Sequence, residues 1–359
     1  MLFAFGSNGS SQLGVGHDED LSEPEPSSLE DSASNGSIKQ VVAGGNHTLI
    51  LFDDGSIQAT GNNEDGRCGI ASPLSLSSFT TVEPTFDSNG RSLKVEQLAA
   101  TWSTTTILCD DGNLYVCGTG NSGELGLGNN IHTSASWAMI PAFPPPGMTI
   151  VDVASSMAHI VVVLSNGEIY GWGKGRKGQN GEPAEDVWAP RSITGIGFFA
   201  IRAVCGRDFT LIAGEPSTGS FLVLGAGKSD GFGIKANAPA SLPQWTDLAA
   251  SWCSIFVLTA VGKMMAWGRN DHGQLPAREL SEVAAIAAGS EHCLALTRTG
   301  KVLAWGWGEH GNCGLLTDEM GDVKPRWNEI AVRGRVTKVF AGCATSFVLT
   351  EEHDSGEGG

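Results

Sequence analysis

The sequence is poor in charged residues and has no long hydrophobic run. Only 17% of its 359 residues are Asp, Glu, Lys or Arg. No stretch approaches the ~18 apolar residues of a membrane-spanning helix. The N-terminal segment from Met1 to Gly6 also lacks the basic stretch and the apolar core of a signal peptide. We therefore expect a protein without a membrane span, located in the cytoplasm and nucleus.

Basic residues are scarce relative to acidic ones. The chain has 22 Lys and Arg against 39 Asp and Glu, which gives a formal net charge of -17. An acidic surface repels the phosphate backbone of nucleic acids, and neither end of the chain carries a Lys/Arg-rich tail. Direct nucleic-acid binding is therefore disfavoured, and chromatin binding with it.

Motifs typical of metal sites and of enzymes are absent. None of the eight cysteines forms a C-x-x-C pair, and most lie within apolar strands. This usage predicts reduced core cysteines in a reducing compartment. The sequence has no Gly-x-Ser-x-Gly elbow and no His-Glu-x-x-His helix, and its carboxylates lie in no recognisable catalytic context. We expect no enzymatic activity, no cofactor and no bound metal.

Long amphipathic helices are missing as well, whereas glycine is abundant, with 49 residues. One sequence pattern recurs along the chain. It consists of small residues, an apolar strand, a tight turn, a second apolar strand that ends in Gly, and a Gly-rich loop. Its clearest copy runs from Ala287 to Gly314. A repeat of this kind with many tight turns predicts an array of β-hairpins.

Alignment of the copies predicts how the array closes. The glycines that end the second strands are Gly6, Gly61, Gly118, Gly173, Gly225, Gly268 and Gly306. The strand before Gly6 has no partner in its own hairpin, and neither has the apolar strand within 340–350 at the other end. Unpaired strand edges are unfavourable. We therefore predict an all-β, seven-bladed β-propeller in which Phe3–Phe5 pairs with Phe347–Leu349.

The expected domain organisation follows from this ring. Residues 1–350 form a single propeller, in which blade seven is shared between 1–16 and 336–350. The remaining residues, 351–359, are polar and acidic and are predicted to be a disordered tail.

Three of the links between blades are predicted to be surface excursions because they are long and polar. They are the segments 17–38, 71–94 and 129–150. The turn of blade four, Gly214–Gly219, is predicted to be longer than the others.

Two repeated features resemble functional motifs but are better explained by the repeat itself. The sequence around Gly118 matches a dinucleotide-binding fingerprint, yet copies recur in register and no helix follows to meet a pyrophosphate. His47, His159 and His292 share one repeat position, where three other blades have a hydroxyl residue and the fourth has Phe209. We expect them to be buried and to bond to loop backbone rather than to act in catalysis or bind metal.

The candidate partner-binding residues lie in loops. Large aromatic residues follow the small residue of two strand-entry loops, and an exposed Trp is typical of a binding hot spot. The alternative, that these side chains pack on a neighbouring blade, remains open. The candidates are Trp102, Trp252, His272, Trp307, Glu309 and His310. A soft metal site formed by His272, His310 and Cys313 is conceivable, but these ligands fall short of a zinc set.

The repeat resembles the regulator-of-chromosome-condensation repeat. That repeat combines a small-small-Gly-x-x-His strand, Asp-Gly, Trp-Gly and Asn-x-x-Gly-Gln-Leu-Gly. Loop copies in this chain include Ser7–Gly14, Asn121–Gly126 and Asn270–Leu275. The resemblance covers about residues 1–350 and implies the propeller fold. It also implies an alternative function, guanine-nucleotide exchange on a small GTPase.

A narrower resemblance rests on two stretches, Phe5–Asp20 and Trp305–Gly314. Both look like the fungal alpha-tubulin-suppressor type of this family, also described as killer-toxin-insensitivity proteins. This resemblance implies a binding scaffold, as a monomer or heterodimer, whose partner is the small CSL-type zinc protein of diphthamide biosynthesis. It also implies an indirect role with the Elongator complex in wobble-uridine modification of tRNA.

Overall fold

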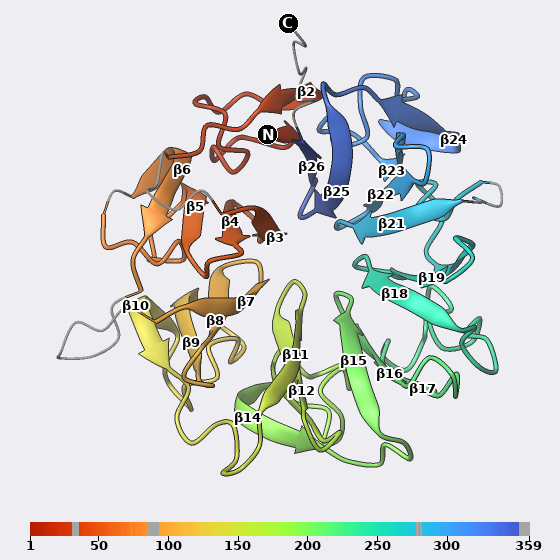
Figure 1. The fold of residues 1–359 in the computed structure, drawn as a ribbon. Helices are drawn as coiled ribbons and strands as arrows, with labels where there is room; N and C mark the ends of the chain where they lie inside the picture. The colour runs from red at the N-terminus through yellow and green to blue at the C-terminus, as the bar shows by residue number, and fades with distance from the viewer. Residues whose placement is uncertain (31–35, 73, 85–92, 278–279, 281, 352–359) are drawn as a thin grey trace, which may run out of the picture.

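The computed structural model describes residues 1–30, 36–72, 74–84, 93–277, 280 and 282–351. Within them, 26 strands form seven antiparallel sheets arranged as blades around a central axis (Figure 1). The predicted all-β, seven-bladed propeller is confirmed. In the described part of the chain, no helix has the length and hydropathy needed to cross a membrane.

Four blades consist of four strands that are consecutive in the chain. Blade one contains β3 (Ile38–Ala43), β4 (His47–Phe52), β5 (Ile57–Asn62) and β6 (Ser75–Val82). Blade two contains β7 (Val95–Ala100), β8 (Thr104–Cys109), β9 (Leu114–Thr119) and β10 (Thr133–Met139). Blade three contains β11 (Ile150–Ser155), β12 (His159–Leu164), β13 (Ile169–Gly173) and β14 (Val187–Ile193). Blade six contains β21 (Val283–Ala288), β22 (His292–Thr297), β23 (Val302–Trp307) and β24 (Asp322–Ile330).

Blades four and five have only three strands each within the described residues. Blade four contains β15 (Ala200–Cys205), β16 (Phe209–Gly214) and β17 (Phe221–Gly225). Blade five contains β18 (Trp245–Ala250), β19 (Ser254–Thr259) and β20 (Met264–Gly268). The predicted long turn of blade four is present, because six residues separate β16 from β17.

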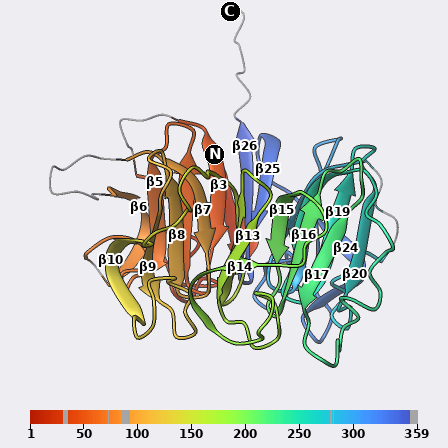
Figure 2. The same ribbon diagram turned by 90° about the horizontal axis from the view of Figure 1, so that it is seen from below.

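Blade seven joins the two ends of the chain in the order β2-β1-β26-β25. Its strands are β1 (Leu2–Gly6), β2 (Leu21–Pro26), β25 (Arg335–Ala341) and β26 (Thr345–Glu351). Phe3 lies opposite Val348 and Phe5 opposite Ser346, and both views show β26 beside the N-terminus (Figures 1 and 2). The predicted closure is thus present. Because β2 supplies the outer strand, the blade takes more of the N-terminal segment than residues 1–16. The predicted disordered tail lies, after Glu351, outside the described residues.

The three long links contain more than surface loops. Each includes an outer strand, namely β2, β6 or β10, so the prediction that these links are only surface excursions is wrong. Outer strands bury few side chains; in β6 only Leu76, Phe79 and Val82 are buried. A strand with one solvated face and few buried positions lacks the apolar pattern that identified the hairpins.

The aligned glycines are required by backbone geometry. All seven have φ between +82° and +123°, a region that residues with a Cβ rarely adopt. In blade six, a Cβ on Gly306 would lie 2.6 Å from the carbonyl oxygen of Glu291. The glycine therefore allows each third strand to end against the entry of the second strand.

The core lies between adjacent blades. The tryptophans that end third strands, Trp172, Trp267 and Trp305, are buried. Each donates its indole N–H to a loop carbonyl 2.9 to 3.1 Å away, those of Glu124, Ile234 and Gln274. These tryptophans are therefore core residues that link neighbouring blades.

Candidate binding face

The strand register places two sets of loops on one side of the ring. Gly61 lies opposite His47, so the loop that enters β4 and the loop that leaves β5 open on the same side. The same holds for the equivalent pairs in the other blades. Leu2 pairs with Leu349 at the opposite ends of these strands. We call the side away from the chain ends the loop face; all six candidate residues lie on it.

Seven equivalent loop residues lie on the loop face, and all of them except Arg207 line the central pocket. They occupy the middle position of the three-residue entry loops and are Gly45, Trp102, Met157, Arg207, Trp252, Ser290 and Cys343. Backbone hydrogen bonds join most of these loops to the next one around the ring. The amide of Gly45 donates to the carbonyl of Trp102 at 3.0 Å, and the amide of Trp102 donates to the carbonyl of Met157 at 2.8 Å. The loops therefore form a nearly continuous hydrogen-bonded collar.

Trp102 and Trp252 meet at this central pocket. Their ring centroids are 6.1 Å apart with an interplanar angle of 39°, although they come from blades two and five. The Trp102 ring lies over Gly45, where a Cβ would collide with the indole, yet 38% of the residue remains exposed. Trp252 is half-buried. Both alternatives raised by the sequence therefore hold in part: each ring packs within the collar, and Trp102 still presents apolar surface to solvent.

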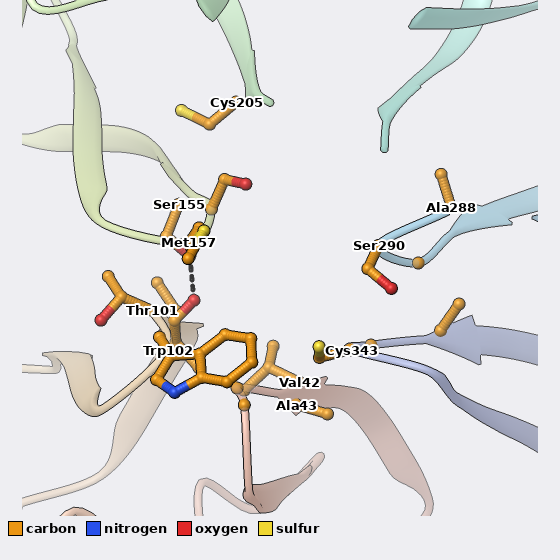
Figure 3. Close-up of a pocket in the computed structure, with 18 of the residues that line it drawn as sticks. Val42, Ala43, Thr101, Trp102, Ser155, Met157, Cys205, Ala288, Ser290 and Cys343 are labelled. Carbon is orange, nitrogen blue, oxygen red and sulfur yellow. Dashed lines mark hydrogen bonds between the residues drawn. The ribbon is translucent and has the colours of Figure 1, made fainter. Parts of the chain in front are cut away.

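Beneath the tryptophans the channel holds a cavity of about 230 Å³. Figure 3 shows Trp102, Met157, Cys205, Ser290 and Cys343 around it, contributed by different blades. Burial raises the pKa of the Cys343 thiol to about 11, so this group is protonated at neutral pH and is a poor nucleophile. The cavity therefore lacks an activated cysteine.

His272 and Trp307 form a second aromatic pair, between blades five and six. Their rings stack with centroids 4.9 Å apart and an interplanar angle of 15°. Nδ1 of His272 lies 2.8 Å from a carboxylate oxygen of Asp322, whose other oxygen accepts from Lys324. These contacts fix the imidazole plane against the indole. The pair is half-buried and presents a rigid surface on the loop face.

Glu309 and His310 continue this surface toward blade seven. Both are exposed. Nδ1 of His310 lies 2.9 Å from a carboxylate oxygen of Asp20, and the other oxygen of Asp20 accepts from the amide of Asn8. The loop after β23 and the loop after β1 are thereby joined. His272, Trp307, Glu309 and His310 thus form one surface over blades five to seven, separate from the central tryptophan pair.

Arg269 and Phe232, which the sequence analysis did not single out, lie between the two groups. The guanidinium lies 5.2 Å from the centroid of the Phe232 ring and forms ion pairs with Asp271 and buried Glu291. Its hydrogen bond lowers the pKa of Asp271 to about 2. Phe232 remains 40% exposed. A sequence signal for this cluster is lacking, because its members belong to different loops.

The structure does not assemble the conceivable metal site. Cys313 is completely buried, and burial raises the pKa of its thiol, whereas His310 is exposed and bonded to Asp20. Among the described residues, no group of three or more His, Cys, Asp or Glu side chains is arranged to hold a metal ion.

The three repeat histidines link neighbouring blades. Nε2 of His47, His159 and His292 lies 2.9 Å from a hydroxyl of the next blade. Each hydroxyl donates its single proton to a loop carbonyl, as Ser346 does to Asn312 at 2.7 Å. The histidine must therefore donate from Nε2. Burial is confirmed, but the direct partner is a side-chain hydroxyl rather than loop backbone.

Comparison with known proteins places this architecture in a family. The model of the RCC1-like domain matches residues 1–349. An RCC1 repeat-containing protein of Schizosaccharomyces pombe is 31% identical, over 98% of this chain and 99% of that protein. The secretion-regulating guanine nucleotide exchange factor of Mus musculus is 30% identical over 77% of this chain, but the match spans only 61% of that protein.

Solved structures agree on the fold. Human WBSCR16 superposes with a TM-score of 0.81 at 18% identity, covering 98% of this chain and all of that one. Prp20p of Saccharomyces cerevisiae gives a TM-score of 0.80 at 21% identity, covering 97% of this chain and 90% of that one. Because the family model extends over nearly all the described propeller, the chain belongs to the RCC1-like domain family.

Proposed function

We propose that this chain is a protein-binding scaffold that uses its loop face to hold a small CSL-type zinc protein of diphthamide biosynthesis. Through this partner it would support Elongator-dependent wobble-uridine modification of tRNA in the cytoplasm and nucleus. The composition of the loop face is the observation that best supports this proposal. It combines rigid aromatic pairs, an exposed Trp102 and exposed charged groups, which is the composition of protein-binding hot spots.

The choice of partner rests on the two stretches that resemble the alpha-tubulin-suppressor type. They are distant in sequence but adjacent in space, because His310 in one contacts Asp20 in the other at 2.9 Å. A surface shared by both stretches supports a single binding site there. Glu309 and His310 would contact the partner at this site, and the tryptophans would supply buried apolar area.

Titration calorimetry with the recombinant zinc-loaded CSL protein tests this proposal. We expect a one-to-one complex and at least tenfold weaker binding for the double variant Glu309→Ala/His310→Ala and for Trp102→Ala. Val261→Ser is the matched control, because Val261 is 68% exposed and lies in a hairpin turn on the opposite face. A wild-type chain that shows no binding, or variants that bind as tightly as wild type, would contradict the proposal.

Guanine-nucleotide exchange is the second candidate. It is favoured by the 30% identity to the secretion-regulating guanine nucleotide exchange factor of Mus musculus. The loop face would then contact the GTPase, and Trp102 and Arg269 would lie in the contact. Release of a fluorescent nucleotide from Ran-type GTPases measures this activity. Faster nucleotide release in the presence of the chain, reduced by Trp102→Ala, would support exchange activity. A release rate that the chain leaves unchanged would exclude this activity for these GTPases.

A further inference from the structure

A pocket of about 190 Å³ lies on the loop face between blades four and five. Four loops line it: Lys177 follows β13, Arg207 precedes β16, Phe232 follows β17 and Trp252 precedes β19. The amide of Arg207 donates to the carbonyl of Trp252 at 2.8 Å, so the walls from blades four and five are bonded to each other. Because Arg207 and Trp252 belong to the collar, the pocket is continuous with it.

The cations at this pocket have hydrogen-bond donors without partners. Lys177 is exposed, and its ammonium makes no ion pair or hydrogen bond within the described residues. Arg207 uses Nε for Asp208, at 3.1 Å, whereas its two Nη groups bond to no described residue. Asp208 is shared with Lys174, at 3.3 Å. One carboxylate thus offsets two cations, and nothing in the described part of the chain neutralises the ammonium of Lys177.

Asp230 is the other carboxylate that lines the pocket. Its Oδ2 accepts hydrogen bonds from the amides of Lys235 and Ala236 at 3.0 and 2.8 Å. Its Oδ1 is buried and has no hydrogen-bond partner among the described residues. A buried acceptor without a donor is unfavourable, so an occupant should bring a donor as well as a negative charge. An acidic residue of a peptide carries both, as its carboxylate and its main-chain N–H.

The charge of this pocket differs from that of the loop face over blades six and seven. There the exposed residues include Asp18, Glu309 and Glu319, and the whole chain carries a formal charge of -17. Complementary charges at an interface select the partner and its orientation. The unpaired donors of Lys177 and Arg207 therefore favour a negatively charged group at the pocket, whereas the other part of the face repels one.

We propose that this pocket binds an acidic segment of the partner protein, with an Asp or Glu carboxylate between Lys177 and Arg207. Charge-assisted hydrogen bonds to these groups are stronger than neutral ones. An apolar neighbour in the segment would contact the ring of Phe232, which is 40% exposed. A nucleic acid fits less well, because a phosphodiester group has no donor for Asp230. The inference rests on the proposed use of the loop face for protein binding and adds the charge of the docking segment.

Fluorescence anisotropy of a labelled peptide, Gly-Glu-Leu-Glu-Gly, with the full chain tests the pocket directly. We expect binding that weakens as the salt concentration rises. Lys177→Glu should weaken it at least about tenfold, and Lys177→Arg should bind as wild type does because it keeps the charge. Lys94→Glu is the matched control, since Lys94 is also exposed and adjoins the hairpin turn at Gly55 on the opposite face. Thermal unfolding verifies that each variant retains the propeller.

Three results would overturn the proposal. The first is no binding of the peptide to wild type, or equal binding to wild type and Lys177→Glu. The second is tighter binding of a single-stranded RNA of the same charge, because the occupant would then be a nucleic acid. The third is concentration-dependent dimerisation of the free chain in sedimentation velocity that Lys177→Glu abolishes, because a second copy would then occupy the pocket.

Titration of the same variants with the zinc-loaded CSL protein separates this inference from the proposed function. If that protein binds wild type and Lys177→Glu equally well, the pocket is not its docking site, and the inference is wrong while the proposed function stands. If that protein does not bind at all but the acidic peptide binds with the expected dependence on Lys177, the proposed partner is wrong while the specificity of the pocket stands.

Discussion

At the scale of single residues, the buried histidines are the groups most sensitive to pH. Burial lowers the pKa of His47 to about 3 and those of His159 and His292 to about 4. An unfolded histidine has a pKa near 6.5. The unfolded chain therefore binds more protons than the folded chain between these values, and the stabilisation is present above pH 6.5 and lost as the pH falls toward 4.

We expect the free energy of unfolding to fall steeply between pH 6.5 and 4.5, with a smaller slope in His292→Gln. Over this range, one histidine accounts for roughly 2–3 kcal/mol of the fall in the free energy of unfolding, and the variant lacks this contribution. The variant should also lose about 1 kcal/mol at pH 7, because the hydrogen bond to Ser346 is replaced imperfectly. Urea unfolding at several pH values measures both effects. Parallel pH profiles for the two proteins would refute the assignment.

At the scale of strands and turns, the aligned glycines decide whether a third strand can end against its neighbour. Gly306→Ala should destabilise the protein by about 2–4 kcal/mol, because φ is +106° and the added Cβ meets the Glu291 carbonyl. Gly9→Ala is the control: no atom lies within 4 Å of its added Cβ. Chemical denaturation of both variants tests this difference, and equal stabilities would contradict the geometric argument.

The same scale shows what the sequence could predict. The hairpins of blades one to three were predictable because β4, β8 and β12 are buried on both faces and the turns contain Asp-Gly or Asn-Gly, as at Asp54-Gly55. The outer strand β2, with the sequence Leu-Ser-Glu-Pro-Glu-Pro, was not predictable, because its burial depends on neighbouring strands that only the closed ring supplies. Trp102 and Trp252 could be selected as candidates, but their mutual contact could not. It arises from the convergence of loops 150 residues apart.

At the scale of the whole molecule, stability depends on the closure of blade seven. Phe5 is completely buried and is part of the core between blades six and seven. Phe5→Ala should therefore destabilise the entire ring by about 3–5 kcal/mol. Val261→Ser, at an exposed site, should change stability by less than about 0.5 kcal/mol. Thermal unfolding measures both, and a small effect of Phe5→Ala would show that closure contributes little.

The closure also predicts that the chain tolerates circular permutation. Met1 and Thr350 exchange hydrogen bonds at 2.6 and 2.8 Å, so a short Gly/Ser-rich turn could join Glu351 to Met1 as in the other hairpins. New ends placed in the exposed turn after Pro216 would interrupt no strand. We expect the permuted protein to retain the circular dichroism spectrum of the original. Loss of folded structure would show that the order of synthesis matters.

The ribosome makes β1 and β2 long before β25 and β26, with which they complete blade seven. About three hundred residues separate Pro26 from Arg335, which at ~5–20 residues per second corresponds to roughly 15–60 s of translation. Throughout this interval the apolar strand Leu-Phe-Ala-Phe of the nascent chain lacks its neighbour β26. We therefore expect a chaperone to shield β1 during synthesis until β26 emerges and pairs with it.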